Sequence, residues 1–194
     1  MDLVPTPSQT AGPFFHLGFS RTFDGVVATP DAKGEHIRLI CRVIDGDGAP
    51  LPDALVEFWQ ANSEGKYHSA DDPQTKPLDP GFRGFGRLAT NGDGTCAFET
   101  VKPGRVPSPA GALQAPHINI SVFGRGILTR LATRIYFSGG PGNGEDPVLA
   151  LVPADRRDTL MAKPDTEPPA TEHPGTWRFD IHLCGHRETV FFDV

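Results

Sequence analysis

Basic charge, long apolar runs and paired cysteines are all scarce in this sequence. The 194 residues carry a formal net charge of -6 and have a pI of about 5.6. This balance argues against a general nucleic-acid binder, which would carry a basic patch. No apolar run reaches the length of a membrane-spanning helix, and residues 1–5 show no basic or apolar part of a secretory signal. The three cysteines form no CxxC pair, which indicates reduced thiols. We therefore expect a cytoplasmic protein.

Glycine and proline are abundant, with 22 and 20 residues respectively. A helical protein tolerates such a load poorly, whereas a β protein with many turns tolerates it well. Alternation of apolar and polar residues predicts most of the strands, and the one helix expected covers residues 153–161. The expected strands are 36–43, 54–60, 83–89, 95–101, 117–123, 130–138, 177–183 and 188–193. The sequence thus predicts an all-β, single-domain β-sandwich of the prealbumin or immunoglobulin type, with long loops and one short helix.

The first 35 residues are expected to form an extended N-terminal arm, followed by the sandwich domain at 36–194. Proline and glycine interrupt the arm at Pro5, Pro7, Gly12, Pro13 and Pro30, so we expect no regular structure there. Its phenylalanines make it too apolar for a free tail. The arm therefore packs either on its own domain or on a neighbouring chain. Residues 62–82 and 102–116 are expected to be long loops, which in a compact domain usually serve function or an interface.

A His-x-Asn sequence on the strand expected at 117–123 points to a metal site that lacks a ligand. Side chains two residues apart on a strand share one face, so a His-x-His pair would place two imidazoles together. Here Asn119 follows His117 in that spacing, and an amide is a far poorer transition-metal ligand than imidazole. The strand alone therefore predicts an incomplete site.

Several segments, in matching order, resemble the intradiol dioxygenases, and in particular the alpha-type chains of that family. The segments are TPSQTAGPF at 6–14, FWQAN at 58–62, GKY at 65–67, LDP at 78–80, FGR at 85–87, APHINIS at 115–121 with Phe123, Arg125 and Gly126, YF at 136–137, RFDI at 178–181, and Gly185 with ETVFFD at 188–193. The resemblance implies a subunit that binds no iron itself. It would line the active site of a homologous iron-bearing beta chain in a hetero-oligomer of several copies, where a catechol ring is cleaved with O₂.

Family members with a working site hold ferric iron through two tyrosines and two histidines. Phenolate oxygens are hard, anionic donors that suit the ferric state, and imidazoles complete the shell. By the resemblance, Tyr67 and His117 stand at the first tyrosine and first histidine positions, while Val106 and Asn119 replace the second of each. With two of four ligands gone, we expect a vestigial site without metal, and no catalytic residue in this chain alone.

Other residues could in principle complete the ligand set. Tyr136 is the only tyrosine besides Tyr67, but mid-strand tyrosines are more often packed aromatics. His68 is expected to be a solvated loop residue, and His182 and His186 lack a partner at ligand spacing. Tyr67 and His117 are themselves compatible with a purely structural, hydrogen-bonding role.

The resemblance also implies residues that this chain contributes to substrate binding at the beta-chain site. Arg125 would meet the carboxylate of the substrate through a charge-assisted bond, although a solvated surface arginine is an equally good interpretation. Phe14 stands where the family often has tyrosine, so a hydroxyl contact is lost. The full expected set is Arg125, Phe14, Thr10, Gly12 and Pro13, and local positive charge would come from Arg105, Arg125, Arg130 and Arg134.

Two other functions remain open on the sequence alone. One is a self-sufficient intradiol dioxygenase with an altered ligand set, against which Val106 and Asn119 argue. The other is a non-catalytic, transthyretin-like β-sandwich that serves as a carrier or scaffold, because a fold does not fix a function.

Overall fold

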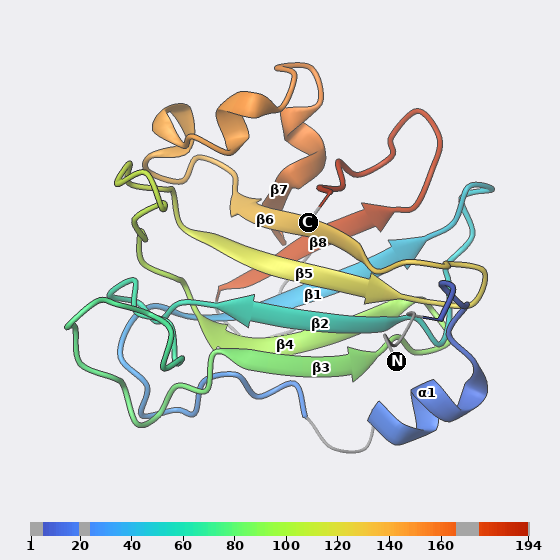
Figure 1. Cartoon of the computed structure of the whole chain (residues 1–194), viewed down its shortest axis with the longest axis horizontal. Coiled ribbons are helices and arrows are strands. Elements are labelled where there is room, and N and C mark those ends of the chain that lie inside the picture. Colours follow the sequence, from blue (N-terminus) through green and yellow to red (C-terminus); the bar gives the residue numbers. More distant parts are fainter. Residues whose placement is uncertain (1–5, 20–23, 166–174, 194) are drawn as a thin grey trace, which may run out of the picture.

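The computed structural model describes residues 6–19, 24–165 and 175–193. Within them the chain is almost entirely β (Figure 1). The elements are α1 (Pro13–Phe19), β1 (His36–Ile44), β2 (Leu55–Gln60), β3 (Phe85–Ala89), β4 (Thr95–Val101), β5 (His117–Phe123), β6 (Leu131–Phe137), the 3-10 helices η1 (Asn143–Glu145), η2 (Leu149–Leu151) and η3 (Arg157–Leu160), β7 (Met161–Pro164) and β8 (Thr176–His182). No helix in these ranges is long and apolar enough to cross a membrane.

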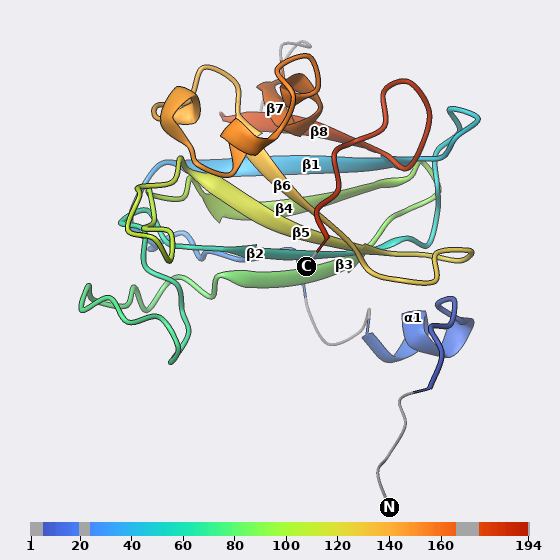
Figure 2. The same cartoon turned by 45° about the horizontal axis from the view of Figure 1, so that its top comes forward.

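The eight strands form one sheet in the order β3-β2-β5-β6-β7-β8-β1-β4. The order begins and ends with strands that follow each other in the chain, and β3 and β4 contact one another. The sheet therefore curls round until it is nearly closed, as Figures 1 and 2 show. The expected all-β class is confirmed. The narrower description as a prealbumin- or immunoglobulin-type sandwich stays a prediction.

Alternating side chains of the curled sheet fill its interior. Leu39, Phe58, Phe98, Ile120 and Ile181 come from five different strands and are almost fully buried. The rings of Phe58 and Phe98 stack at 4.7 Å between centroids. Residues of the opposite parity point outward, and those on β2, β5 and β6 form the face that carries the site described below.

Three predicted elements differ from the structure. At 153–161 there is only the 3-10 helix η3, and Met161 already begins β7, because its pairing with Tyr136 of β6 supplies ladder hydrogen bonds that a helix would forgo. At 188–193 there is no strand but a single bridge, between Phe192 and Ala132. The arm contains a seven-residue helix, α1, where none was expected; proline is tolerated at its first position, since that N–H has no helical partner.

The arm divides into two parts with different surroundings. Val27, Ala28 and Ala32 are buried in the chain's own core, and Val27 bonds to the backbone of Glu99. Helix α1 instead lies outside the sheet (Figure 2), with Phe14 85% exposed. The division of the chain at residue 35 stays a prediction.

Candidate functional site

A row of outward-facing residues crosses the sheet at the centre of the site. On β5, Asn119 pairs with Trp59 of β2 on one side and with Arg134 of β6 on the other. His117 lies two residues earlier on the same face and is 3% exposed. The strand register therefore brings the predicted His117 and Asn119 together, next to a tryptophan ring and a guanidinium group.

The loop after β2 delivers Tyr67 to this row. A buried ion pair between Lys66 Nζ and Asp72 Oδ1, at 3.3 Å, organises the loop. The Lys66 ammonium also donates to the carbonyl oxygens of Asp72 and Gln74, and Asp72 Oδ2 accepts from the backbone N–H of Tyr67. With its backbone fixed in this way, the Tyr67 ring stacks on Trp59, 5.7 Å between centroids and 8° from parallel.

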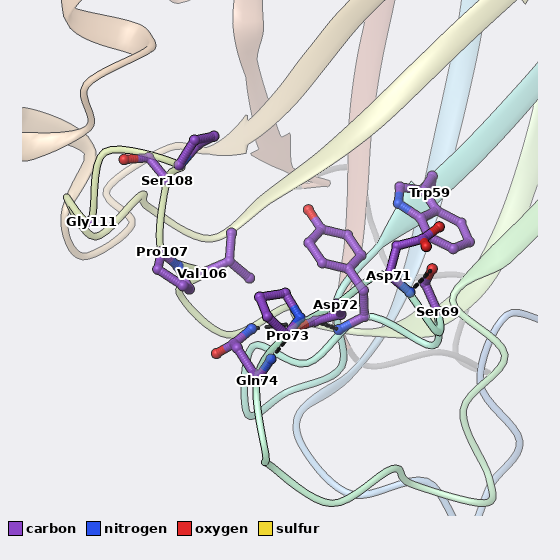
Figure 3. A pocket seen from close by; sticks show the side chains of 12 residues that line it. Trp59, Ser69, Asp71, Asp72, Pro73, Gln74, Val106, Pro107, Ser108 and Gly111 are labelled. Atoms are coloured by element: carbon purple, nitrogen blue, oxygen red, sulfur yellow. Dashed lines mark hydrogen bonds between the residues drawn. The ribbon is translucent and has the colours of Figure 1, made fainter.

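A second loop, between β4 and β5, carries Val106. This loop and the loop of Tyr67 together line a cavity of about 670 Å³ (Figure 3). The two loops abut at glycines. Gly65 has a φ of 78°, and any side chain there would clash with the carbonyl oxygen of Arg105. A side chain on Gly104 would meet the backbone of Ser63 and Gly65 in the same way. The backbone positions of both expected tyrosine ligands are therefore close together, with Val106 buried at the second.

The polar contacts at the site join neutral groups. The Tyr67 hydroxyl lies 3.5 Å from Nε2 of His117, and Asn119 Nδ2 lies 3.4 Å from the same hydroxyl. Nδ1 of His117 is 2.8 Å from the carbonyl oxygen of Ala115, so Nδ1 carries the hydrogen and Nε2 accepts. Burial, with help from the nearby Arg134 charge, lowers the pKa of His117 to about 4. Burial also raises the pKa of Tyr67, so phenol and imidazole are both uncharged near neutral pH.

These residues do not fit ferric iron. Only the Tyr67 oxygen and His117 Nε2 are suitable donors, because Val106 has none and Asn119 turns its amide nitrogen toward Tyr67. Within the described part of the chain no group of three or more His, Cys, Asp or Glu side chains could hold a metal ion. The proposed substitutes are engaged elsewhere: His68 Nδ1 bonds to the Phe82 carbonyl oxygen, and Tyr136 donates to Asp146. His182 lines a separate cavity of about 300 Å³ beside Arg187, and His186 is exposed.

The residues expected to contact substrate lie outside the cavity beside Tyr67. Thr10 Oγ1 accepts a hydrogen bond of 2.7 Å from the backbone N–H of Gly126, so the arm is attached to the loop that carries Arg125. Gly12, Phe14 and Arg125 are exposed, and Pro13 begins α1. Thr10 and Arg125 are thus brought together, and Phe14 projects from the adjoining helix.

Of the four arginines expected to supply positive charge, two stand near the expected ligand positions. Arg134 Nη1 donates to Gln114 Oε1 at 2.7 Å. Arg105 donates to the Gln114 and Leu113 carbonyl oxygens and pairs with Glu145. Arg125 and Arg130 are exposed.

Two supports of the site carry no motif and were missed from the sequence. The Lys66–Asp72 pair is one. The other is Asp146, a fully buried carboxylate that accepts from the backbone N–H groups of Ala115, Val148 and Leu149 and from the Tyr136 hydroxyl. Asp146 lies in a loop between glycines and a proline. Neither its residue type nor its spacing marks it in the sequence, because its hydrogen-bond partners come together only in the folded chain.

Comparison with known proteins places this geometry in a family. Residues 11–185 match the profile of a family described as Dioxygenase. The chain is 45% identical over 204 residues to the protocatechuate 3,4-dioxygenase alpha chain of Burkholderia cepacia, covering 99% of this chain and 98% of the relative. The chain belongs to the intradiol dioxygenase family. Intradiol dioxygenases depend on iron, and in the described part of this chain Tyr67, Val106, His117 and Asn119 do not offer a complete donor set for it.

Two further intradiol relatives define how far the likeness extends. The protocatechuate 3,4-dioxygenase beta chain of Burkholderia cepacia is 38% identical over 165 residues, covering 84% of this chain and 70% of the relative. The solved structure of hydroxyquinol 1,2-dioxygenase from Pseudomonas putida DLL-E4 superposes with a TM-score of 0.65 at 22% identity, covering 91% of this chain and 65% of that chain. That structure supports the fold. This chain is therefore similar to both chain types of one enzyme.

Proposed function

We propose that this chain is the alpha subunit of a protocatechuate 3,4-dioxygenase and binds no iron itself. The assembled enzyme would cleave 3,4-dihydroxybenzoate with O₂ to 3-carboxy-cis,cis-muconate, in the beta-ketoadipate pathway of the cytoplasm. One observation carries the proposal: the Tyr67 hydroxyl and His117 Nε2 lie 3.5 Å apart, while valine stands at 106 and asparagine at 119, where the resemblance would place the two other ligands.

The proposed partner is a homologous beta chain, in a hetero-oligomer with several copies of each chain. Similarity to curated alpha and beta chains supports this assembly. The beta chain would hold ferric iron with a complete set of two tyrosines and two histidines, and the iron there would bind the catechol and activate it toward O₂. This chain would contribute no catalytic residue of its own.

The proposed task of this chain is to bind and orient the substrate at the beta-chain site. The arm and the loop joined by the Thr10–Gly126 bond present Arg125 and Phe14 outward. The planar guanidinium of Arg125 suits the substrate carboxylate, because it can donate two parallel hydrogen bonds. Phe14 would cover the ring and exclude water, and Thr10, Gly12 and Pro13 would shape the same wall.

Iron content and the visible spectrum test this proposal directly. Ferric iron bound to tyrosinate gives a red-brown charge-transfer band. We expect the chain purified alone to be colourless and free of iron. We expect the complex co-expressed with a candidate beta chain to be coloured and active on 3,4-dihydroxybenzoate. A lone chain that is itself coloured and cleaves this substrate would overturn the proposal and favour a self-sufficient dioxygenase.

A further inference from the structure

The outer face of β5 and β6 carries a second cavity, of about 290 Å³, next to the vestigial ligands. Ala132 and Arg134 lie on the outward face of β6, Arg130 directly precedes the strand, and Ser121 of β5 pairs with Ala132. The small Ala132 side chain leaves a gap between the two arginines. Val148 and Phe192 form the apolar walls, and Asp193 stands at the rim.

Arg134 is a half-buried cation. In the residues that the structure describes, it donates to the neutral Gln114 amide and also interacts with the Tyr136 hydroxyl, and no acidic side chain lies within ion-pairing distance. Arg87, which is outward-facing on the same sheet, is paired with Glu57. A partly desolvated guanidinium without a counter-ion is uncommon, since its charge has lost water without gaining an opposite charge.

The floor of this cavity offers further donors. Asn119 directs one amide hydrogen to Tyr67, which leaves its second hydrogen available. The Ser121 hydroxyl makes no hydrogen bond within the described ranges, and the same holds for the Arg130 guanidinium. The polar lining thus consists mostly of groups that bind an anion, and Asp193 is the one acid among them.

We propose that this cavity binds a small aromatic carboxylate, held by Arg134 and Arg130. Arg134 would donate to the carboxylate as a planar fork, assisted by Asn119 and Ser121. The ring would lie between Val148 and Phe192 and cover both side chains. An inorganic anion would leave these apolar side chains uncovered. The volume matches a ligand of one ring, at the small end of the usual range for ligand cavities. The site needs no metal, and the inference does not rest on the proposed subunit function.

The test uses the full-length chain alone, ¹⁵N-labelled, titrated with benzoate and followed by NMR. Benzyl alcohol serves as a neutral probe of nearly the same shape. We expect benzoate to bind with a Kd of about 1 mM or tighter and to shift the side-chain amide signals of Gln114 and Asn119. Benzyl alcohol should bind at least about tenfold more weakly, because it lacks the charge that a guanidinium recognises.

Three variants make the test specific. Arg134→Gln should weaken benzoate binding about tenfold or more, as loss of one charge-assisted contact predicts. Arg130→Gln, at an exposed residue, should weaken it less, and Ala132→Leu should block it by filling the gap. Arg42→Gln removes the same charge from an exposed position on β1 and should leave the affinity unchanged.

Some outcomes would overturn the inference. They are no binding of benzoate up to about 10 mM, equal binding of benzyl alcohol, or unchanged affinity in both Arg134→Gln and Ala132→Leu. Thermal unfolding of each variant confirms that lost binding is not lost folding. Failure of this test leaves the subunit proposal untouched, since that proposal is judged by the colour and activity of the complex.

Discussion

The Tyr67 hydroxyl points at Nε2 of His117 across 3.5 Å, where two iron ligands would face a common metal. Because Nδ1 of His117 donates to the Ala115 carbonyl oxygen, Nε2 can accept the phenol hydrogen. Tyr67 and His117 therefore satisfy each other's hydrogen-bonding groups without a metal ion. Their protonation states can be tested by experiment.

Stability should depend on pH through His117. Its folded pKa is about 4, against 6.5 for an ordinary histidine, so the unfolded chain takes up a proton that the folded chain refuses. The contribution of His117 to the free energy of unfolding is then fully present above pH 6.5. It is lost as the pH falls toward 4, which lowers the unfolding free energy by about 1–3 kcal/mol. Urea unfolding at pH 7, 5.5 and 4.5 measures this slope. His117→Gln should have a shallower slope over the same range; an unchanged slope would show that other groups cause it.

Restoring the missing ligands should restore metal binding. The double variant Val106→Tyr and Asn119→His would supply two tyrosines and two histidines around one point, and we expect it to take up ferric iron with a red-brown absorption band. Each single variant should bind more weakly, since three protein ligands hold the metal less firmly than four. Metal analysis and absorbance after loading measure the gain. If the double variant binds no more iron than the unaltered chain, the backbone positions differ from those of a working site.

The buried Lys66–Asp72 pair should matter far more than an exposed pair. Burial alone would raise the pKa of Asp72, but the N–H groups of Gln74 and Tyr67, together with Lys66, lower it. Asp72→Asn would leave the Lys66 ammonium buried without its counter-charge, so we expect a loss of about 3 kcal/mol in unfolding free energy. Asp158→Asn breaks the exposed pair with Lys163 and should cost no more than about 1 kcal/mol. Equal urea midpoints for the two variants would argue against this account of the loop.

Arg125 can be examined through substrate selectivity in the assembled enzyme. Arg125→Ala should raise KM for 3,4-dihydroxybenzoate by about tenfold and change KM for catechol little, because only the former has a carboxylate to bind. Arg42→Ala is the matched control, from the exposed side of β1. Equal changes for both substrates would contradict a role for Arg125 in carboxylate recognition.

The sheet was largely predictable because half-buried strands have a strong period of two. β1 and β8 follow their alternation within a residue or two. β7 has only four residues, too few for a pattern, and the polar sequence before it favours a helix locally. The strand expected at 188–193 fails for the opposite reason: it has the right residue types, but only Phe192 meets a partner there. Tertiary pairing, which local sequence does not encode, decided both cases.

The site was predictable only in part. Period two placed His117 and Asn119 together, and the likeness to a family placed Tyr67 and Val106 beside them. The contact between Arg134 and Gln114 joins residues twenty positions apart, and its geometry depends on the register of β6 against β5. Nothing in the sequence indicated that the guanidinium would stand half-buried with no carboxylate of the described residues within ion-pairing distance.

The abutting glycines Gly65 and Gly104 separate the shape of this site from its chemistry. The two loops meet through backbone atoms, and the buried ion pair of Lys66 and Asp72 organises the first of them, so neither arrangement depends on the side chain at a ligand position. A metal-bearing ancestor could therefore lose its iron through single substitutions and still fold. After gene duplication, an enzyme built in this way could exchange its ligand side chains one at a time and become a structural subunit.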